Sequence, residues 1–509
     1  MDKITVNPHF CARRRGHRFI QTDIWLTVIV CLSCLVVSLP SLAQVVLPTY
    51  REFTVDTLSD DLNPAGCSLR EAVESINTGG NVGGCLATSR PGDEFDTIRF
   101  SPTVLPGQIF LTDRLLVEAG LRLLGPEDGT LEISGSNLVQ LMLISNQSPG
   151  VALRNLHLTQ GFSSNNGGGI SALAPLVVSN SVISQCESMA VGGGIIAAGG
   201  LTLDNVVLED NLAGDAGAVY SIGPLQISDS IFSGNTATGV IDGGGALWVD
   251  HGGADPVQKN VSATRFSGNE APNGGAVLVS NTGDMPTEPL IIETSTFENN
   301  RATAGRGSAV MQKDGSHTVV IRRSLLVDSM QSVAETQIDQ EGVPSDTARL
   351  QLVNSTVVGN DGLRANSQLD LRSVTMVLTT PQAGTALEVS PGRTARIRDS
   401  ILLSEGGADC LGAMANIVEN ENNVFFTSTC AQTGANVITD DAQLGPLQDN
   451  GGATLTMAPL PGSPVIDAGS IFCPADDQRG AIRSDGACDI GAVEAGPSDA
   501  LFSDGFEQP

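Results

Sequence analysis

A degenerate repeat in the middle of the chain limits the fold more than any other sequence feature. Its copies read VVLEDNLAGDAGAVY, FSGNTATGVIDGGGALWV, FSGNEAPNGGAVLV and FENNRATAGRGSAVM, and begin at Val206, Phe232, Phe266 and Phe297. Each has an apolar residue, an asparagine three positions later, a turn of small residues and an apolar run. The asparagines Asn211, Asn235, Asn269 and Asn300 are 24, 34 and 31 residues apart. This period in short strands is typical of a solenoid.

The composition of the repeat predicts which solenoid forms. Each unit holds short β-branched and aliphatic runs separated by Gly, Asn, Asp and Ser, without a recurrent helical period. One unit cannot bury its apolar side chains, whereas stacked units form parallel sheets around a continuous interior. We therefore expect an all-β fold, a parallel β-helix that is right-handed by the crossover preference. Asparagines at one position in successive coils should hydrogen-bond along the stack.

The stretch CSLREAVESINTGG (residues 67–80) predicts one amphipathic helix before the repeats. Ser68 and Glu71 form a capping box at its start. One apolar face is formed by Leu69, Ala72, Val73 and Ile76. Because so short a helix is marginal alone, we expect it to cap the amino end of the solenoid. The sequence DTIRF (residues 96–100) is expected to be the first coil strand.

The first 43 residues have the features of an export signal. Four arginines precede an apolar run over residues 24–39, and Ser41-Leu42-Ala43 offers a small-x-small cleavage site. The run of about 16 residues is short for a membrane span. An uncleaved anchor is the alternative. The mature chain is then expected to contain no transmembrane segment.

The cysteine spacing indicates an oxidising compartment. Seven of the ten cysteines lie beyond the signal, and six of them form sequence-local couples. The predicted disulfides are Cys67–Cys85, Cys410–Cys430 and Cys473–Cys488. Cys186 is left over and is predicted to be a buried free thiol.

The charge excludes some partners. Removing five basic and two acidic residues with the signal leaves 22 and 54, a net charge of −32. This charge argues against nucleic acid and against an anionic membrane surface.

Two longer motifs and the repeats resemble known families. The stretch CSLREAVESIN resembles the motif of the CSLREA-domain proteins, which are exported bacterial β-helix proteins. The FxxN and GGA[VIL] elements are similar to the repeats of polymorphic outer-membrane proteins. The stretch LGPLQDNGGATLTMAPLPGSPVIDAG, with DQRG (477–480) and CDIGAVE (488–494), resembles the choice-of-anchor Q domain. These resemblances imply a pectin-lyase-like fold in a secreted or surface-exposed protein.

The resemblances also suggest a domain organisation. The final LFSDGFEQP resembles a short ending of exported proteins, and is predicted to be either a sorting tag or a frayed acidic tail. The predicted parts are a signal peptide (1–43), an N-terminal CSLREA cap (44–97), β-helix repeats (98–405), a C-terminal choice-of-anchor Q-like cap (406–495), and a linker with the acidic tail (496–509).

Catalysis deserves a test because right-handed β-helices include pectate lyases and polygalacturonases. Such enzymes need clustered carboxylates and a nearby basic residue. The weak candidates are Asp242, Asp250 and His251 on one coil, and Arg396, Arg398 and Asp399 on a later one. We interpret them as turn residues on a solvated face. The histidines His157, His251 and His317 are too far apart in sequence to suggest a cluster.

Other ligand signals are weak. Aromatic residues that could stack on sugars are scarce, because Trp248 is the only tryptophan, and Tyr50 and Tyr220 the only tyrosines, after the signal. Two oxygen-rich segments, 56–63 and 440–450, are interpreted as polar loops that flank the caps; calcium binding is the alternative, although neither segment has EF-hand spacing. No other cofactor is expected.

The sequence therefore predicts a non-catalytic adhesion or surface-interaction protein that binds an unknown surface glycan or protein. It is expected outside the cell or on the outer surface of a Gram-negative bacterium. The alternative is a polysaccharide lyase or glycoside hydrolase of pectin-lyase-like fold.

Overall fold

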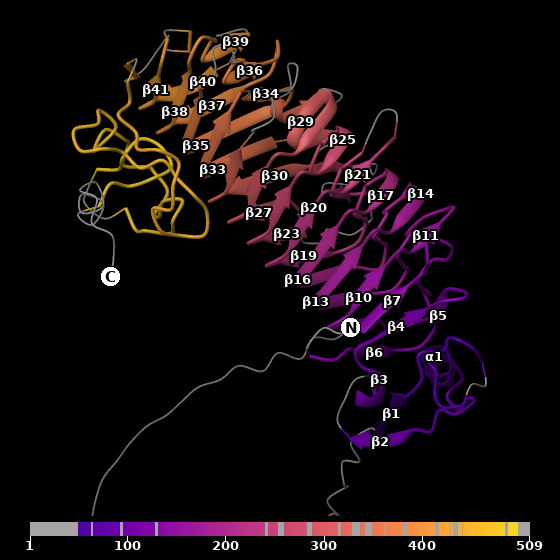
Figure 1. The fold of residues 1–509 in the computed structure, drawn as a ribbon. Helices are drawn as coiled ribbons and strands as arrows, with labels where there is room; N and C mark the ends of the chain where they lie inside the picture. The colour runs from indigo at the N-terminus through magenta and orange to yellow at the C-terminus, as the bar shows by residue number, and fades with distance from the viewer. Residues whose placement is uncertain are drawn as a thin grey trace, which may run out of the picture. The chain divides into compact units, whose positions relative to one another are not determined.

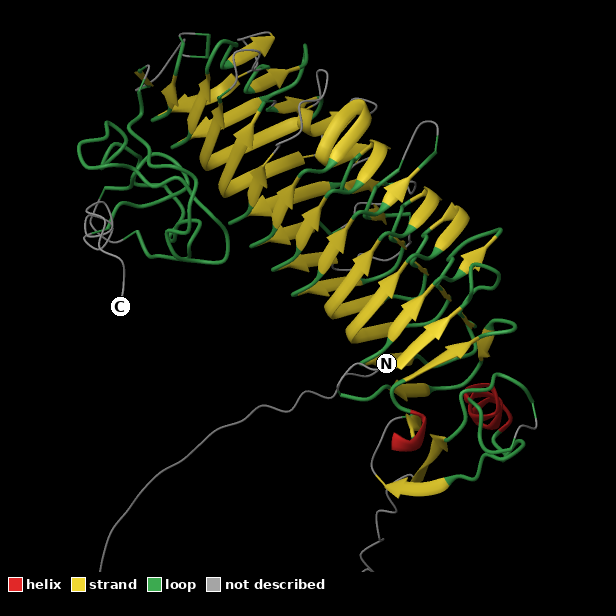
Figure 2. Ribbon diagram, viewed as in Figure 1, coloured by secondary structure: helices red, strands yellow, loops and turns green. Residues whose placement is uncertain are grey.

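The computed structural model describes residues 49–496, apart from 63–64, 92–94, 128–130, 240–242, 253–258, 282–287, 314–316, 328–335, 342–348, 361, 380–383, 413–416, 428, 431–435, 440 and 484–486. The predicted signal peptide and acidic tail lie outside the described residues. From Thr49 onward the chain forms one compact unit. Strands dominate this unit, and helices are confined to its amino end (Figure 2).

Two long sheets contain the strands (Figure 1). Within the described residues, sheet A has 25 strands. They are β1 (Thr49–Val55), β2 (Thr88–Pro91), β3 (Asp96–Phe100), β4 (Gly107–Phe110), β6 (Leu121–Leu124), β7 (Leu131–Ser134), β9 (Val151–Arg154), β10 (His157–Thr159), β13 (Leu176–Ser184), β16 (Leu201–Glu209), β19 (Leu225–Ser228), β20 (Ile231–Ser233), β23 (Lys259–Ser262), β24 (Arg265–Ser267), β27 (Leu290–Glu293), β28 (Thr296–Glu298), β30 (Thr318–Arg322), β31 (Leu325–Val327), β33 (Arg349–Gly359), β35 (Gln368–Leu378), β37 (Ala395–Arg398), β38 (Ile401–Ser404), β40 (Ile417–Glu421), β41 (Val424–Phe425) and β42 (Val437–Ile438).

Sheet B has 17 strands in the same described part of the chain. They are β5 (Leu115–Val117), β8 (Met142–Ile144), β11 (Phe162–Ser163), β12 (Ile170–Ala172), β14 (Glu187–Val191), β15 (Ile195–Ala197), β17 (Leu212–Asp215), β18 (Val219–Ser221), β21 (Thr236–Ala237), β22 (Leu247–Asp250), β25 (Glu270–Asn273), β26 (Val277–Ser280), β29 (Arg301–Lys313), β32 (Thr336–Glu341), β34 (Leu363–Ala365), β36 (Leu387–Val389) and β39 (Cys410–Gly412).

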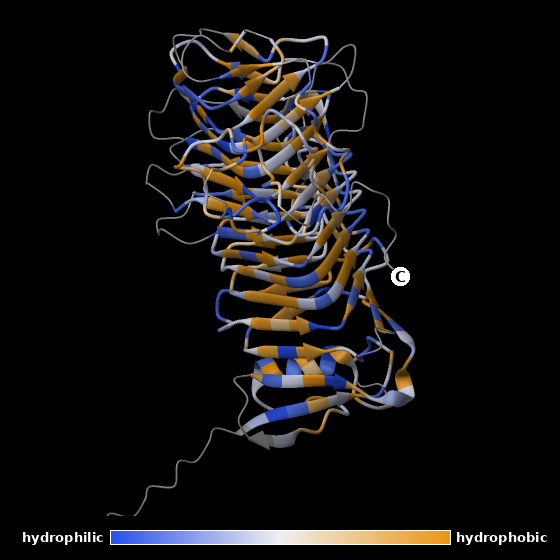
Figure 3. Cartoon of the chain, turned by 90° about the vertical axis from the view of Figure 1, so that its left-hand side faces the viewer, coloured by the Kyte–Doolittle hydropathy of each residue, from blue (hydrophilic) through white to orange (hydrophobic). Residues whose placement is uncertain are grey.

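Successive coils pair in parallel and in register. For example, Leu176 in β13 lies opposite Leu201 in β16, which lies opposite Leu225 in β19. This pattern is the parallel β-helix that the repeats predict. Alternate side chains point inward, so rows of leucine, isoleucine and valine fill the interior, and Figure 3 shows hydrophobic positions recurring on successive strands. Phe232, Phe266 and Phe297 stack at 5.0 and 4.8 Å between ring centroids inside three neighbouring coils.

From β9 to β40, each coil of sheet A bends at a residue with left-handed backbone angles. At one corner of sheet A these residues are Asn180, Asn205 and Asp229, with φ of 47°, 53° and 49°. Asparagine and aspartate tolerate this region, which costs other residues roughly 1–2 kcal/mol. The same corner holds Ala263 and Thr294 in the next two coils. Stacking therefore maintains the bend even where the local sequence does not favour it.

The glycine-rich stretches allow close approach of backbones at another corner. A Cβ on Gly217 would lie 2.1 Å from the carbonyl oxygen of Gly245, and one on Gly245 would lie 2.0 Å from that of Gly275. Real Cβ atoms do not come this close. The repeated GGA sequence is thus a requirement of coil-on-coil packing.

The repeated asparagines form the predicted ladder. Asn211, Asn235 and Asn269 each donate from Nδ2 to Oδ1 of the next asparagine, at 3.0, 2.9 and 2.9 Å. Each also donates to a backbone carbonyl of the preceding coil, as Asn269 does to Phe232 at 3.0 Å. Cys186 occupies the equivalent position one coil earlier, where its amide donates to Oδ1 of Asn211 at 3.0 Å. It is the predicted buried free thiol, and burial raises its pKa to about 12.

The amino end is covered by the predicted helix and by a strand that was not expected. Helix α1 (Leu69–Thr78) has the capping box of Ser68 and Glu71, and its apolar face packs against β1, β3 and β5. Strand β1 pairs in parallel with β3, so the solenoid begins at Thr49, one coil before the expected first strand. Strand β2 pairs antiparallel with β1, and a short 3-10 helix (Pro102–Val104) follows β3.

The three predicted disulfides are present. They join Cys67 to Cys85, Cys410 to Cys430 and Cys473 to Cys488. The first encloses helix α1, because its two cysteines lie before and after the helix. Among the described residues, no helix is both long and apolar enough to cross a bilayer.

Residues 441–496 lie along the side of sheet A, next to β33, β35, β38 and β41 (Figure 1). Val465 and Ile490 pack against the outward-facing Val377 and Ile401 in a second apolar cluster. The Gln478 amide donates to the Ser324 carbonyl at 3.2 Å and accepts from Thr356 Oγ1 at 2.6 Å. The segment therefore covers several coils laterally, which the sequence did not indicate.

We expect replacement of an asparagine in the ladder to destabilise the protein more than replacement of an asparagine on the surface. Asn269→Ala removes the acceptor for both Nδ2 and the backbone amide of Asn235, at 2.9 and 3.1 Å. Leaving such buried groups unsatisfied costs about 1–3 kcal/mol each. We expect a clearly lower midpoint of chemical unfolding for Asn269→Ala. Asn260→Ala, on the outer face, should stay within about 0.5 kcal/mol of the parent chain; equal losses in both variants would contradict the ladder's role.

A substitution in the capping helix should cause aggregation and proteolysis at the amino end, and not only a loss of stability. Val73→Asp places a charge in the buried face of α1, where burial of each apolar side chain contributes about 2 kcal/mol. We expect soluble aggregation and proteolysis from the amino end, because the helix covers the end of the solenoid. Size-exclusion chromatography and limited proteolysis measure this. Glu74→Ala changes the exposed neighbour and should behave as the parent; similar behaviour of both variants would rule out a capping role.

Candidate functional site

A cluster of buried ionisable side chains lies where sheet B passes into sheet A, at the end of β22. Asp250, His251, Lys259 and His317 are 4%, 3%, 0% and 1% exposed. Asp250 ends β22, Lys259 begins β23, and His317 precedes β30. Stacking of coils brings these residues together although they are distant in the sequence.

Lys259 stands in a column of apolar residues. Its register partners are Leu225 in the preceding coil and Leu290 in the next. The ammonium group donates to the carbonyl oxygens of Ile222 and Gly223, the former at 2.8 Å. Burial lowers the pKa of Lys259 to about 8, and the charge of Asp250 opposes this shift. The interior thus accommodates a lysine by hydrogen bonds to corner carbonyls.

His251 and His317 stack with ring centroids 5.3 Å apart and planes 20° apart. Burial lowers the pKa of His317 to about 4. Burial, with the neighbouring His317 and Lys259, lowers the pKa of His251 to about 3. Both nitrogens of His317 and Nε2 of His251 are buried without a hydrogen-bond partner among the described atoms. Nearly parallel rings direct their lone pairs along parallel planes, so the pair does not converge on a shared metal ion.

The structure corrects the interpretation of the first candidates. Asp250 and His251 are buried and do not lie on a solvated face. The Asp250 carboxylate accepts from the Tyr220 hydroxyl at 2.9 Å and from the Gly252 amide at 2.9 Å. His251 and His317 form a pair, contrary to what their sequence distance suggested. Asp242 lies outside the described residues.

The later candidates serve the packing of the C-terminal segment and of neighbouring coils. Arg396 and Arg398 both pair with Glu419. Asp399 accepts from the Ser470 amide at 2.6 Å and from its hydroxyl at 2.8 Å. Arg398 also lines an open pocket of about 300 Å³, together with Glu421, Ser470 and Phe472.

Sequence reasoning made no prediction for Lys259, and it led us to expect no pairing of His317 with His251. Alignment of PLQIS (224–228), QKNVS (258–262) and PLIIE (289–293) places the lysine in a leucine column, so a signal for Lys259 existed. His317 carries no such signal, because its position depends on coil lengths that vary between repeats.

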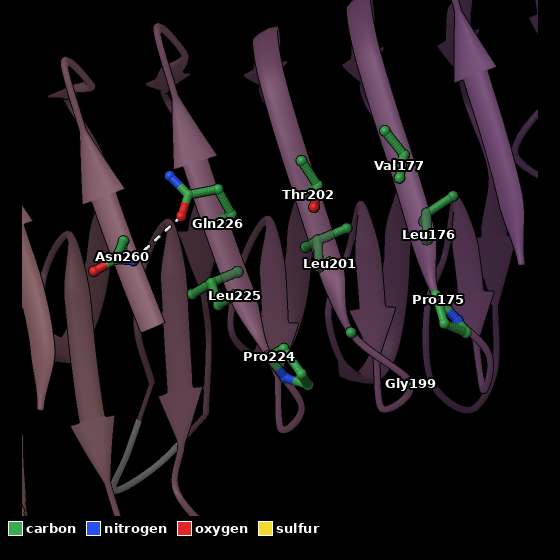
Figure 4. A pocket seen from close by; sticks show the side chains of 11 residues that line it. Pro175, Leu176, Val177, Gly199, Leu201, Thr202, Pro224, Leu225, Gln226 and Asn260 are labelled. Carbon is green, nitrogen blue, oxygen red and sulfur yellow. Dashed lines mark hydrogen bonds between the residues drawn. The ribbon is translucent and has the colours of Figure 1, made fainter. Parts of the chain in front are cut away.

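An open groove of about 300 Å³ crosses four coils on the outer face of sheet A (Figure 4). Its floor and one rim include Pro175, Gly199, Gly200 and Pro224. The other rim is a row of register partners, one from each strand: Val177, Thr202, Gln226 and Asn260. The Asn260 amide donates to the Gln226 side-chain oxygen at 3.2 Å. No lining residue is ionisable, so the groove offers hydrogen bonds and apolar contact without acid or base groups.

In the two segments considered as calcium sites, described acidic residues form hydrogen bonds and ion pairs within the protein. Asp56 accepts from the Cys67 amide at 2.6 Å, and Asp60 pairs with Arg70 at 2.6 Å. In the described part of the chain, no group of three His, Cys, Asp or Glu residues is placed to hold a metal ion. Asp440 lies outside it.

Matches between this chain and known proteins are few. No family model matches the chain, and no curated protein matches it. Among solved structures, it is similar to pectate lyase Pel9A, with 11% identity and a TM-score of 0.37 over 88% of this chain and 98% of that one.

The histidine pair predicts an acid-sensitive stability. Unfolded histidines bind protons below about pH 6.5, whereas folded His317 and His251 do so only near pH 4 and 3. The contribution of the two histidines to stability is therefore fully present above pH 6.5 and is lost as the pH falls from about 6.5 to 4, at about 1.4 kcal/mol per pH unit for each histidine.

Replacing one histidine should reduce this slope. The stability difference between the parent and His317→Leu, followed by chemical unfolding at pH 7, 6, 5 and 4, should shift in favour of the variant as the pH falls. Asn260→Ala, which removes no ionisable group and lies on the outer face of sheet A, is the control and should show a constant difference. A constant difference for His317→Leu as well would show that the buried ring does not govern the acid response.

Proposed function

We propose that the protein is an exported, non-catalytic β-helix that binds a surface glycan or protein along the outer face of its coils. The observation that carries this proposal is the groove beside Val177, Thr202, Gln226 and Asn260. Its rim presents one side chain per coil, at the interstrand spacing of about 4.8 Å. A regular row of this kind suits an extended ligand that runs parallel to the solenoid axis.

The chemistry of the groove favours binding over catalysis. Glycoside hydrolysis needs two carboxylates beside the scissile bond, and the groove is lined by amide, hydroxyl and apolar groups. Asp250 has a basic neighbour in Lys259, as an enzyme would require, but both are buried outside the groove. Three disulfides support an extracellular location, since such bonds persist in oxidising compartments.

The proposal predicts that the groove row determines binding. The chain from residue 44 would be applied to an array of neutral and acidic oligosaccharides and to immobilised extracellular-matrix proteins. The double variant Gln226→Ala/Asn260→Ala loses two side-chain amides, and we expect affinity for the bound probe to fall about tenfold or more. Thermal unfolding should be unchanged, because both side chains are on the outer face.

A matched control changes polar side chains of the same sheet outside the groove. Arg265→Ala removes an exposed ion pair with Glu298 and should leave binding intact. Release of unsaturated uronides from pectin by the parent chain would contradict the non-catalytic proposal. Absence of binding to every glycan and protein probe would contradict the adhesion proposal.

A further inference from the structure

Tyr220 and Trp248 come together on the outer face of sheet B. After the predicted signal, Trp248 is the only tryptophan and Tyr220 is one of two tyrosines. They are register partners on β22 and β18, and Ile196 on β15 precedes them in the same row. The two rings lie 5.1 Å apart at 84°. Both rings are partly exposed, whereas the next two members of the row, Leu278 and Met311, are fully buried.

The polar atoms of both rings are already bound within the protein. The Tyr220 hydroxyl donates to Oδ2 of Asp250 at 2.9 Å, and Trp248 Nε1 donates to the Ser280 hydroxyl at 2.7 Å. The rings are therefore held in one orientation before any ligand arrives, which reduces the entropy lost on binding. What they offer to a ligand is carbon surface.

The described residues that lead into β18 and β22 have short side chains, because residues 216–218 and 243–246 are glycine and alanine. The connection before β22 spans residues 238–246, against 216–218 in the preceding coil, and the connection after it spans 251–258, against 222–224. Both connections of β22 are therefore longer in sequence than those of β18.

We propose that Ile196, Tyr220 and Trp248 form a stacking platform for a neutral glycan. This inference rests on the proposed function and adds a second contact surface to it. Aromatic rings combine apolar faces with fixed orientation, which suits the C–H faces of sugar rings. A polyuronate is disfavoured by the net charge of −32 of the chain after the signal. Asp250, the carboxylate bound to Tyr220, is buried, so it does not recruit a cationic ligand to the platform.

The single tryptophan provides the test. The emission of Trp248 in the chain from residue 44 would be followed during titration with neutral oligosaccharides (cello-, xylo-, manno- and chito-oligomers), oligogalacturonate and oligolysine. We expect a saturable change with at least one neutral series and none with the two charged probes. Tyr220→Ala should weaken that binding about tenfold, while Tyr220→Phe, which keeps the ring, should stay close to the parent.

The outcomes separate this inference from the proposed function. Tyr50→Phe, at the amino end, is the control and should bind as the parent. If a glycan binds without changing Trp248 emission and Tyr220→Ala is silent, while Gln226→Ala/Asn260→Ala abolishes binding, the platform is overturned and the groove stands. Preferential binding of oligolysine or oligogalacturonate at Trp248 would overturn the ligand class. Circular dichroism confirms that each variant is folded, and Trp248→Phe measured by calorimetry checks the effect without fluorescence.

Discussion

Parallel backbone hydrogen bonding between coils, in register, determines what each residue of this protein can be. Leu176, Leu201 and Leu225 lie directly over one another. In the same way, each residue of a coil packs against the equivalent residues of the coils before and after it. The interior therefore selects stacks of one kind of side chain, such as Phe232, Phe266 and Phe297. Polar side chains enter only where a neighbour in the stack or a corner carbonyl supplies their hydrogen bonds. The asparagine ladder satisfies this condition through its own repetition.

The need of buried polar side chains for hydrogen-bond partners is met less completely by Lys259 and the two stacked histidines. The lysine in the leucine column reaches corner carbonyls, but the ring nitrogens of His317 have no partner among the described atoms. Two members of this cluster, Asp250 and His251, lie at the end of β22, the strand that carries Trp248. Asp250 joins the buried cluster to the partly exposed aromatic pair, because its carboxylate accepts a hydrogen bond from the Tyr220 hydroxyl. The coil that contains β22 thus has unusual residues both in its interior and on its surface.

Features with a repeated or local sequence signal could be predicted, and features that depend on contacts between distant residues could not. The asparagines from Asn211 to Asn300 indicated the coil spacing, and Ser68 with Glu71 indicated the start of the helix. Both could be recognised because each signal lies within a short stretch of sequence. Disulfide pairing followed from short spacing. Strand β1 was missed since Phe53 and Val55 lie outside any repeat. The pairing of His251 with His317 depends on how many residues each intervening coil contains, and the side packing of residues 441–496 depends on contacts such as Gln478 with Ser324.

The lateral C-terminal segment has a consequence for how the chain is completed. A ribosome delivers the coils in order, and each can stack on the one before it as it emerges. Val377, Ile401 and Leu403, however, face outward and are covered only when Val465 and Ile490 arrive. A chain that ends early would thus be a finished rod with an apolar stripe on its flank, a surface that proteases and chaperones recognise. Val465 and Ile490 therefore protect the flank of the coils from such recognition.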